Sequence, residues 1–324
     1  MLRVVTGLFD RALPPDALCC IRFGHKLTAH ADGRVVDVAM TSLEAATDCE
    51  SWLGQGPASS GTWKGIRYAH DGETLVACLS LPPAQCLDLE RTTQFSYMRM
   101  DSLIRRLGYP YWLRMWNYFG RINEGSGDAE RYRRFNSGRY GAVALHDAVR
   151  DNLPAASGVG AYSDDMVLIA VAGRRPAQQI ENPRQVSAYC YPRQYGLYAP
   201  LFSRAALIPN SHGAQLLISG TASIVGHESR HAANVAAQLD ETLANVQALL
   251  AETQRLHPSD PNADALQLES LKVYLRHRAD LGVVAAGLRR WASPLSPPLF
   301  LQAEICRREL LLEIEGTFQL PQVA

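Results

Sequence analysis

The 324-residue sequence contains little that would indicate a disulfide-bonded or membrane-spanning protein. Its seven cysteines are odd in number and include no CxxC pair, so they predict neither a disulfide framework nor a zinc-ligand set. No apolar run approaches the roughly 20 residues of a membrane span. The first residues, MLRVVTGLFDRALPPD, do not have the pattern of a secretory signal. We therefore expect a reduced, cytoplasmic protein without a membrane partner.

A charge surplus of either sign is also absent. Lys+Arg and Asp+Glu are both 32, which gives a formal net charge of zero. Without a basic excess to neutralise phosphates, the sequence predicts no nucleic-acid partner, although a local cationic pocket for a small anion remains compatible with it. Hydrophobic residues make up 47% and charged residues 20%, as in a globular chain with a large core. We expect a monomer or a small homo-oligomer.

The second half of the chain has the clearer pattern of elements. The helix expected over 233–256 carries Leu239, Leu243, Val246 and Leu250 at helical spacing. Around it we expect strands at 166–172, 215–220 and 270–276, a helix at 279–291, and strands at 300–307 and 312–317 that turn at 308–311. This order predicts an α+β or α/β fold whose helices pack on one face of a sheet.

The first half reads as short strands and two helices. Strands are expected at 35–40, 74–79 and 111–118, and helices at 94–107 and 129–149. The stretch 153–164 is rich in proline and glycine and is the best candidate for a boundary. We therefore predict an N-terminal α+β half over 1–152 and a catalytic half over 165–324.

The last segment carries two carboxylates in a strand pattern. Glu313 and Glu315 alternate with Leu312 and Ile314, so both should face the same side. If 308–311 closes a hairpin, Cys306 lies opposite Glu313, with Cβ atoms about 5 Å apart. Two interpretations stay open: a strand face wetted by solvent, or a partly apolar pocket that raises a carboxyl pKa enough for proton donation.

Two further segments suit a small anionic ligand. Residues 187–204, SAYCYPRQYGLYAPLFSR, hold four tyrosines and two arginines, and residues 131–139, RYRRFNSGR, hold four arginines. Tyrosine hydroxyls and an arginine fork can bind a carboxylate. The same residues also fit a packed aromatic loop and a solvated basic helix face, and the residues alone do not decide between these.

The segment HESRH at 227–231 matches the HExxH pattern of zinc proteases. That site needs both histidines on one face of a helix. Here the match follows a glycine-containing strand end, without an aliphatic helix leading in and without an obvious third ligand. We therefore predict no metal site.

Several of these segments together resemble the chorismatase family. SAYCYPRQYG (187–196), LLISGTASIVGHESRH (216–231) and LQAEICRRELLLEIEG (301–316) look like its signature segments, and WNYFGRINE (116–124) and RYRRFNSGR (131–139) are similar to its middle region. The resemblance covers most of 110–324 and absorbs HESRH into a family loop. It implies an α+β fold with a RidA-like (chorismate mutase-like) mixed sheet in the C-terminal part, whose helices pack on one face. It also implies a related or degenerate N-terminal α+β half that supplies part of the pocket wall.

The resemblance also implies a reaction, in which chorismate is cleaved to pyruvate and a hydroxybenzoate without a metal or organic cofactor. Glu313 resembles the family's catalytic glutamate, which would protonate the enolpyruvyl methylene. Family members that form 3-hydroxybenzoate carry a cysteine and a glycine at the positions of Cys306 and Gly220, so we expect that product and leave 4-hydroxybenzoate open as a second one. The expected substrate-binding residues are Tyr132, Arg139, Arg193, Tyr195, Gly220 and Thr221. The alternative is a RidA-like deaminase or ligand-binding protein that does not act on chorismate.

Overall fold

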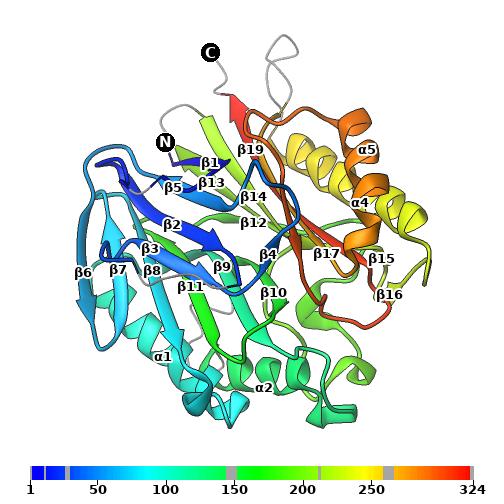
Figure 1. Ribbon diagram of the computed structural model, residues 1–324, viewed down its shortest axis with the longest axis horizontal. Coiled ribbons are helices and arrows are strands. Elements are labelled where there is room, and N and C mark those ends of the chain that lie inside the picture. The colour runs from blue at the N-terminus through cyan, green and yellow to red at the C-terminus, as the bar shows by residue number, and fades with distance from the viewer. Residues whose placement is uncertain are drawn as a thin grey trace.

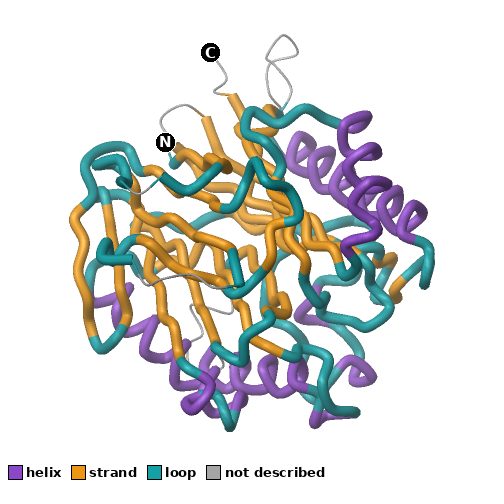
Figure 2. Tube along the Cα trace, viewed as in Figure 1, coloured by secondary structure: helices purple, strands orange, loops and turns teal. Residues whose placement is uncertain are grey.

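Two large β-sheets form the centre of the molecule, and each carries a pair of helices on its outer face (Figure 1). The computed structural model describes residues 2–10, 12–25, 30–143, 152–210, 213–257 and 266–321. Figure 2 shows the helices at two separate sides of the molecule with the strands between them. Within the described ranges, no helix is long and apolar enough to cross a lipid bilayer.

The first sheet has six strands in the order β10-β9-β11-β8-β7-β6. Only β10 and β9 run parallel; the other neighbours are antiparallel. Helices α1 (Leu89–Arg106) and α2 (Arg131–Val143) cover its outer face and enclose a core with it. The strands are β6 (Ser59–Trp63), β7 (Ile66–His70), β8 (Thr74–Leu81), β9 (Tyr111–Gly120), β10 (Ala155–Ala161) and β11 (Met166–Gly173).

The second sheet has seven strands in the order β12-β13-β14-β19-β17-β18-β4. Helices α4 (Val235–Leu256) and α5 (Leu281–Trp291) pack on its outer face through an aliphatic stripe that includes Leu239 and Leu243. This confirms the α+β fold with helices on one sheet face. The strands are β4 (Thr41–Ser42), β12 (Gln178–Ile180), β13 (Ala205–Asn210), β14 (Gly213–Thr221), β17 (Gln267–Leu275), β18 (Leu299–Gln302) and β19 (Leu312–Pro321).

A third, four-stranded sheet and a small hairpin complete the architecture. The four-stranded sheet has the order β1-β5-β2-β3, and its side chains join the inner faces of the two large sheets in one central core. The hairpin follows β14 in the chain. The remaining strands are β1 (Arg3–Gly7), β2 (Ala17–Phe23), β3 (Val35–Val38) and β5 (Cys49–Leu53), with β15 (Ile224–Val225) and β16 (Glu228–Ser229) in the hairpin.

The helix boundaries differ from expectation for local reasons. Asp88 caps α1 by accepting a hydrogen bond from the Arg91 amide, so the helix begins at Leu89 rather than near 94. Gly108, with φ +81°, follows the last turn and ends the helix there, as expected. The helix expected over 129–149 is α2, described over Arg131–Val143; residues 144–149 lie outside the described ranges.

The C-terminal hairpin prediction is wrong. β18 pairs in parallel with β17, and β17 pairs antiparallel with β19, so β17 lies between the two strands expected to be neighbours. The residue opposite Glu313 is Tyr274, not Cys306. A tight hairpin needs turn residues that 308–311 does not contain. The chain instead uses residues 303–311 as a loop that carries it past β17.

The strand pairing also shows that the chain leaves the first sheet later in the sequence than expected. The stretch 153–164, the candidate boundary, contains β10, and the strand expected at 166–172 is β11; both belong to the first sheet. The change of sheet therefore follows Gly173. In addition, β4 from the N-terminal part pairs with β18 at the edge of the second sheet. The division into domains at 152 and 165 stays a prediction. The second sheet contains strands from both parts of the chain.

Candidate active site

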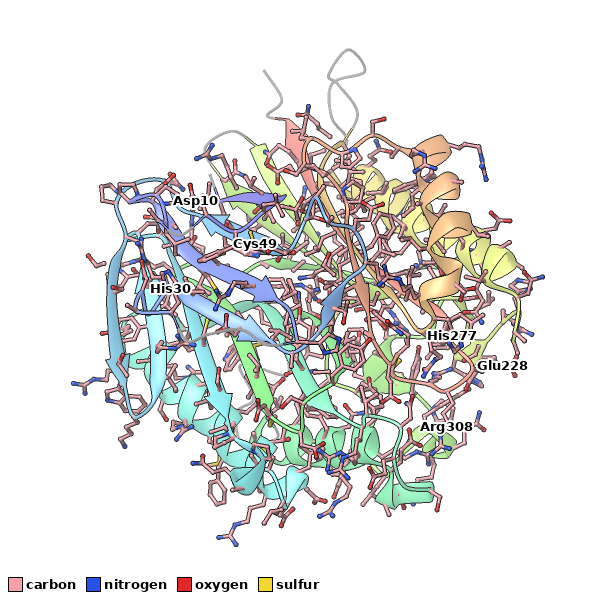
Figure 3. All side chains as sticks on the ribbon, viewed as in Figure 1. Asp10, His30, Cys49, Glu228, His277 and Arg308 are labelled. Carbon is pink, nitrogen blue, oxygen red and sulfur yellow. The ribbon has the colours of Figure 1, made fainter. Side chains whose placement is uncertain are left out.

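A cavity of about 390 Å³ is formed by α2, the end of β14, the tyrosine-rich segment after β12 and the loop before β19. Such a volume suits a small organic ligand. Its wall is rich in tyrosine and arginine and also contains Gly220, Cys306 and Glu313. Figure 3 labels Arg308, one of the lining residues, on the same lower right side as Glu228 of β16 and away from Asp10 and Cys49.

Glu313 lies on β19, which has a partner strand on both sides, and its side chain is buried at 4% exposure. Among the described residues, no group donates a hydrogen bond to its carboxyl oxygens. Burial, and secondarily the nearby Glu315 carboxylate, raises the pKa of Glu313 to about 8, although Arg114 acts in the opposite direction. Glu313 is therefore a mostly neutral acid on the cavity wall at pH 7.

Glu315, two residues further along the same strand face, is equally buried but fully partnered. Its carboxylate lies 3.0 Å from Arg114 Nη2 and 3.3 Å from Lys272 Nζ, and the Trp116 indole N–H donates to it at 2.8 Å. Burial by itself would raise the pKa of Glu315, but Lys272 and Arg114 outweigh it and lower the pKa to about 2. The expectation that both carboxylates face one side is confirmed, and that side is the interior rather than solvent.

Gly220 forms the wall directly beside Glu313. The pairing of β14 with β19 is irregular between Ile218 and Thr221, which brings the Gly220 backbone towards the carboxyl group. The Ser157 hydroxyl of β10 accepts a hydrogen bond from the Gly220 amide at 3.0 Å. A Cβ atom at position 220 would overlap with the Glu313 carboxyl group, so the glycine leaves the space in which that group lies.

Cys306 and Tyr132 are the other proton-bearing groups around Glu313. Burial, followed by the charge of Glu313, raises the pKa of the Cys306 thiol to about 12. Burial also raises the pKa of the Tyr132 phenol, with smaller contributions from Cys306 and Glu313. Both groups are thus neutral at physiological pH. Cys306 reaches this place through the loop 303–311, so its expected proximity to Glu313 arises by another route than the predicted hairpin.

Three arginines on the cavity wall, Arg204, Arg307 and Arg308, have no carboxylate partner within ion-pair distance among the described residues. Arg308 is exposed and donates to the Asn123 and Gly125 carbonyls. Arg204, 5% exposed, donates through Nη2 to the Tyr191 hydroxyl and the Val186 carbonyl, while its buried Nε is unpartnered. Arg307 donates to the Ser229 hydroxyl and packs over the Tyr195 ring, 4.0 Å from its centre. Their positive charges are therefore available to an anionic ligand.

The structure brings five of the predicted site residues together around this cavity and leaves three outside its lining. Arg193 is largely exposed and pairs with Asp128 at 2.6 Å. Arg139 belongs to α2 and is buried, with its guanidinium 5.4 Å from the Tyr97 ring centre. Thr221 donates to the Ser219 carbonyl. The residues that do line the cavity are Tyr132, Tyr195, Gly220, Cys306 and Glu313.

Sequence reasoning missed Arg204 and Arg307. Both lie in segments that the sequence analysis had selected: Arg204 is the last residue of the tyrosine-rich segment, and Arg307 directly follows Cys306. What distinguishes them from Arg193 is burial and the absence of a partner carboxylate, which depend on contacts between segments far apart in the chain. Tyr191, which contacts both arginines, was part of the segment but was not singled out.

The HESRH segment lies on the β15–β16 hairpin and the turn after it, not on a helix. His227 Nδ1 is 3.2 Å from the Tyr195 hydroxyl, and His231 Nε2 is 3.1 Å from Glu241 on α4. The two histidines thus serve different partners, and the helix that a zinc-protease site requires is not formed. No group of three potential metal ligands occurs within the described ranges.

Comparison with known proteins identifies the family. A 3-hydroxybenzoate synthase from Streptomyces hygroscopicus is 33% identical over 288 residues, which span 87% of this chain and 84% of that protein. A chorismatase from Streptomyces rapamycinicus is 33% identical over 91% of this chain and 90% of its own length. The chain belongs to the chorismatase family.

Two further comparisons agree with this assignment. Residues 50–172 match the model of the chorismatase FkbO/Hyg5-like N-terminal domain. The crystal structure of a chorismatase, 31% identical, covers 98% of both chains with a TM-score of 0.88. The α+β arrangement described above is therefore the fold of a chorismatase throughout its length.

Proposed function

We propose that this chorismatase cleaves chorismate to pyruvate and 3-hydroxybenzoate, with Glu313 as the proton donor. The observation that carries the proposal is the Glu313 carboxyl group, which is buried, without a hydrogen-bond partner among the described residues, and on the wall of a cavity rich in arginine and tyrosine. A structural carboxylate would be partnered, as Glu315 is. An acid that has to meet a carbon atom of the substrate needs to be free.

The chemistry follows from the substrate. Chorismate carries two carboxylates and an enolpyruvyl ether on a cyclohexadiene ring. Protonation of the terminal methylene converts the enol ether to an oxocarbenium ion, from which pyruvate leaves after water adds. Loss of the ring hydroxyl as water then gives the aromatic hydroxybenzoate, so one water is consumed and one is released. This protonation requires one general acid, and a carboxylic acid beside the methylene carbon can supply it.

The charge state of Glu313 suits this role. With a pKa of about 8, the carboxyl group is protonated in roughly nine of ten molecules at pH 7. An ordinary carboxyl group would hold its proton in fewer than about one in a hundred. After the transfer, the resulting carboxylate would face the cationic intermediate and stabilise it electrostatically.

We assign the two substrate carboxylates to Arg204 and Arg307. A dicarboxylate needs two positive charges, and these two guanidinium groups line the cavity without an ion-pair partner among the described residues. Tyr191 lies between them, with its ring 5.4 Å from one guanidinium carbon and 5.2 Å from the other. The earlier assignments to Arg139 and Arg193 stay predictions, which now require the substrate to reach outside the lining described above.

Product choice is proposed from Gly220 and Cys306, which both contact the space around Glu313. The resemblance of these positions to the 3-hydroxybenzoate-forming type agrees with the name of one curated relative. The test is to incubate the purified protein with chorismate and to identify the products by chromatography. Pyruvate with 3-hydroxybenzoate supports the proposal; pyruvate with the non-aromatic diol would overturn the product choice, and unconsumed chorismate would overturn the substrate.

The role of Glu313 needs its own comparison. The Glu313→Gln variant preserves the shape but has no acidic proton, and we expect turnover to fall by about 100-fold to 10,000-fold, the usual contribution of a general acid. Glu252→Gln, which removes a half-buried carboxylate paired with the exposed Arg255 on α4, is the control and should turn over chorismate normally. Full turnover by the Glu313 variant would refute the mechanism.

A further inference from the structure

Directly behind Glu313, four charged side chains are buried between the sheets. Lys272 Nζ lies 2.9 Å from Glu50 and 3.3 Å from Glu315, and Arg114 Nη2 lies 3.0 Å from Glu315. None of the four side chains is more than 6% exposed. They come from β5, β9, β17 and β19, so all three sheets contribute to one buried group of charges.

The charges in this group balance, and Glu313 is the carboxyl group left over. Arg114 and Lys272 provide two positive charges, which Glu50 and Glu315 neutralise. Neutral donors fix Glu315 further: the Tyr274 hydroxyl donates to its Oε1 at 3.0 Å and is itself 2.9 Å from the Tyr118 hydroxyl. A negative charge on Glu313 would be an unbalanced charge in the interior.

Stability does not account for so many buried charges. Taking ions out of water costs several kcal/mol for each, and well-packed apolar residues of the same volume are often as stable or more so. Glu315 and Glu313 are two residues apart on one strand face, about 7 Å along β19. The Ser157 hydroxyl accepts from Arg114 at 2.8 Å and from the Gly220 amide at 3.0 Å, which connects the buried charges to the wall beside Glu313.

We propose that Glu315, held ionised by Arg114 and Lys272, is a positioning residue for Glu313: its fixed negative charge keeps Glu313 in the protonated form that the reaction uses. This inference rests on the proposed role of Glu313 as acid. Glu315 itself does not line the cavity and therefore acts through its neighbour.

The other groups around Glu313 do not replace this effect. Arg114 acts against it, because a positive charge favours the ionised form. Tyr132, Tyr274 and Cys306 all have raised pKa values and are neutral. The charged groups elsewhere on the cavity wall do not contribute to the pKa shift of Glu313. They are Arg133, Arg204, Arg307, Arg308, Glu130 and Glu309. Apart from burial, Glu315 is the group that raises the pKa of Glu313.

The experiment compares Glu315→Gln with Glu50→Gln. Each variant removes one of the two carboxylates that pair with Lys272. Only Glu315→Gln removes the carboxylate that lies next to Glu313 on β19. Activity that needs protonated Glu313 falls as pH rises through its pKa. We expect this fall in kcat to move to lower pH by about one unit or more in Glu315→Gln and to stay in place in Glu50→Gln. An unmoved profile in the first variant, or equal shifts in both, would overturn the inference.

A readout independent of turnover separates this inference from the proposed function. The infrared carbonyl stretch of a protonated carboxyl group, identified as Glu313 by its absence in Glu313→Gln, should titrate near pH 8 in the unmodified protein and lower in Glu315→Gln. If that shift occurs without chorismate cleavage, the inference holds and the proposed reaction fails. If Glu315→Gln does not fold, Lys272→Met/Glu315→Gln removes one charge of each sign. The double variant should show the same downward shift, and a carbonyl band that still titrates near pH 8 would overturn the inference.

Discussion

Gly220 and Glu313 lie so close that a side chain on the first would exclude the observed position of the second. A Cβ atom built on Gly220 would be 1.8 Å from Glu313 Oε1 and 3.0 Å from the Ser157 hydroxyl oxygen. Both distances are shorter than ordinary van der Waals contact. The missing methyl group at position 220 is therefore part of what places the acid.

Gly220→Ala should fold normally but lose turnover. The atom that has to move is the end of a flexible side chain, so we expect the melting temperature to change little. Displacement of the acid by about 1 Å from the reacting carbon costs roughly 100-fold in kcat. Steady-state kinetics measure the effect, with Gly56→Ala as control, since no atom lies within 4 Å of a Cβ built there. Unchanged kcat would show that Glu313 can act from a different position.

The raised pKa of Glu313 should also appear in the stability of the protein. The native state keeps this proton up to about pH 8, whereas the unfolded chain releases it near its ordinary value of 4.5. Between these values the native state binds more protons, so the free energy of unfolding falls as pH rises, by about 4 to 5 kcal/mol in all as an order of magnitude.

Denaturant unfolding of the unmodified protein and of Glu313→Gln at a series of pH values measures this effect. The difference between the two should be constant below about pH 4.5, should change between pH 4.5 and 8, and should level off above pH 8. A difference that is constant over the whole range would show that Glu313 titrates normally.

Arg204→Met should weaken substrate binding more than it slows chemistry. A charge-assisted hydrogen bond to a carboxylate contributes about 1.5 to 3 kcal/mol, so we expect KM to rise by roughly 10-fold to 100-fold. Arg204→Lys keeps the charge but not the planar fork and should recover part of the loss. Arg255→Met, on the surface of α4, is the control. A rise in KM for Arg193→Met but not for Arg204→Met would assign the substrate carboxylate to Arg193 instead.

Cysteine alkylation at neutral pH should spare Cys306. Its pKa of about 12 keeps it a thiol, and the thiolate is the reactive form. Cys190 is the exposed cysteine among the described residues and should react first. Iodoacetamide treatment followed by peptide mass spectrometry identifies the labelled site, and chorismate turnover should survive. Labelling of Cys306 ahead of Cys190, with loss of activity, would indicate an ionised cysteine.

The sequence supports the α+β fold, the helix stripe of α4 and the shared face of Glu313 and Glu315, because each follows from local periodicity. It does not show which side of that face is buried. That depends on β9 and β10, which cover β19 from a part of the chain some 150 to 200 residues away. The expected hairpin failed for the same reason, since β17 enters between β18 and β19.

Individual arginines illustrate the limit most clearly. Arg193 and Arg204 lie eleven residues apart in one aromatic segment and have the same chemistry. Asp128 pairs with the first and leaves it exposed, whereas Tyr191 and Phe202 enclose the second. Which arginine reaches the cavity is decided by these contacts and not by the composition of the segment.

Strand β10 joins the two large sheets beside the cavity. It pairs with β9, its Ala156 amide donates to the Ser219 hydroxyl of β14, and its Gly160 forms a bridge with Glu304 of the C-terminal loop. In chimaeras that exchange halves between distant relatives at this strand, the cavity would therefore be lined by residues from two proteins that do not fit each other. New specificities in such a protein should arise more readily from single substitutions within an intact chain than from recombination of its parts.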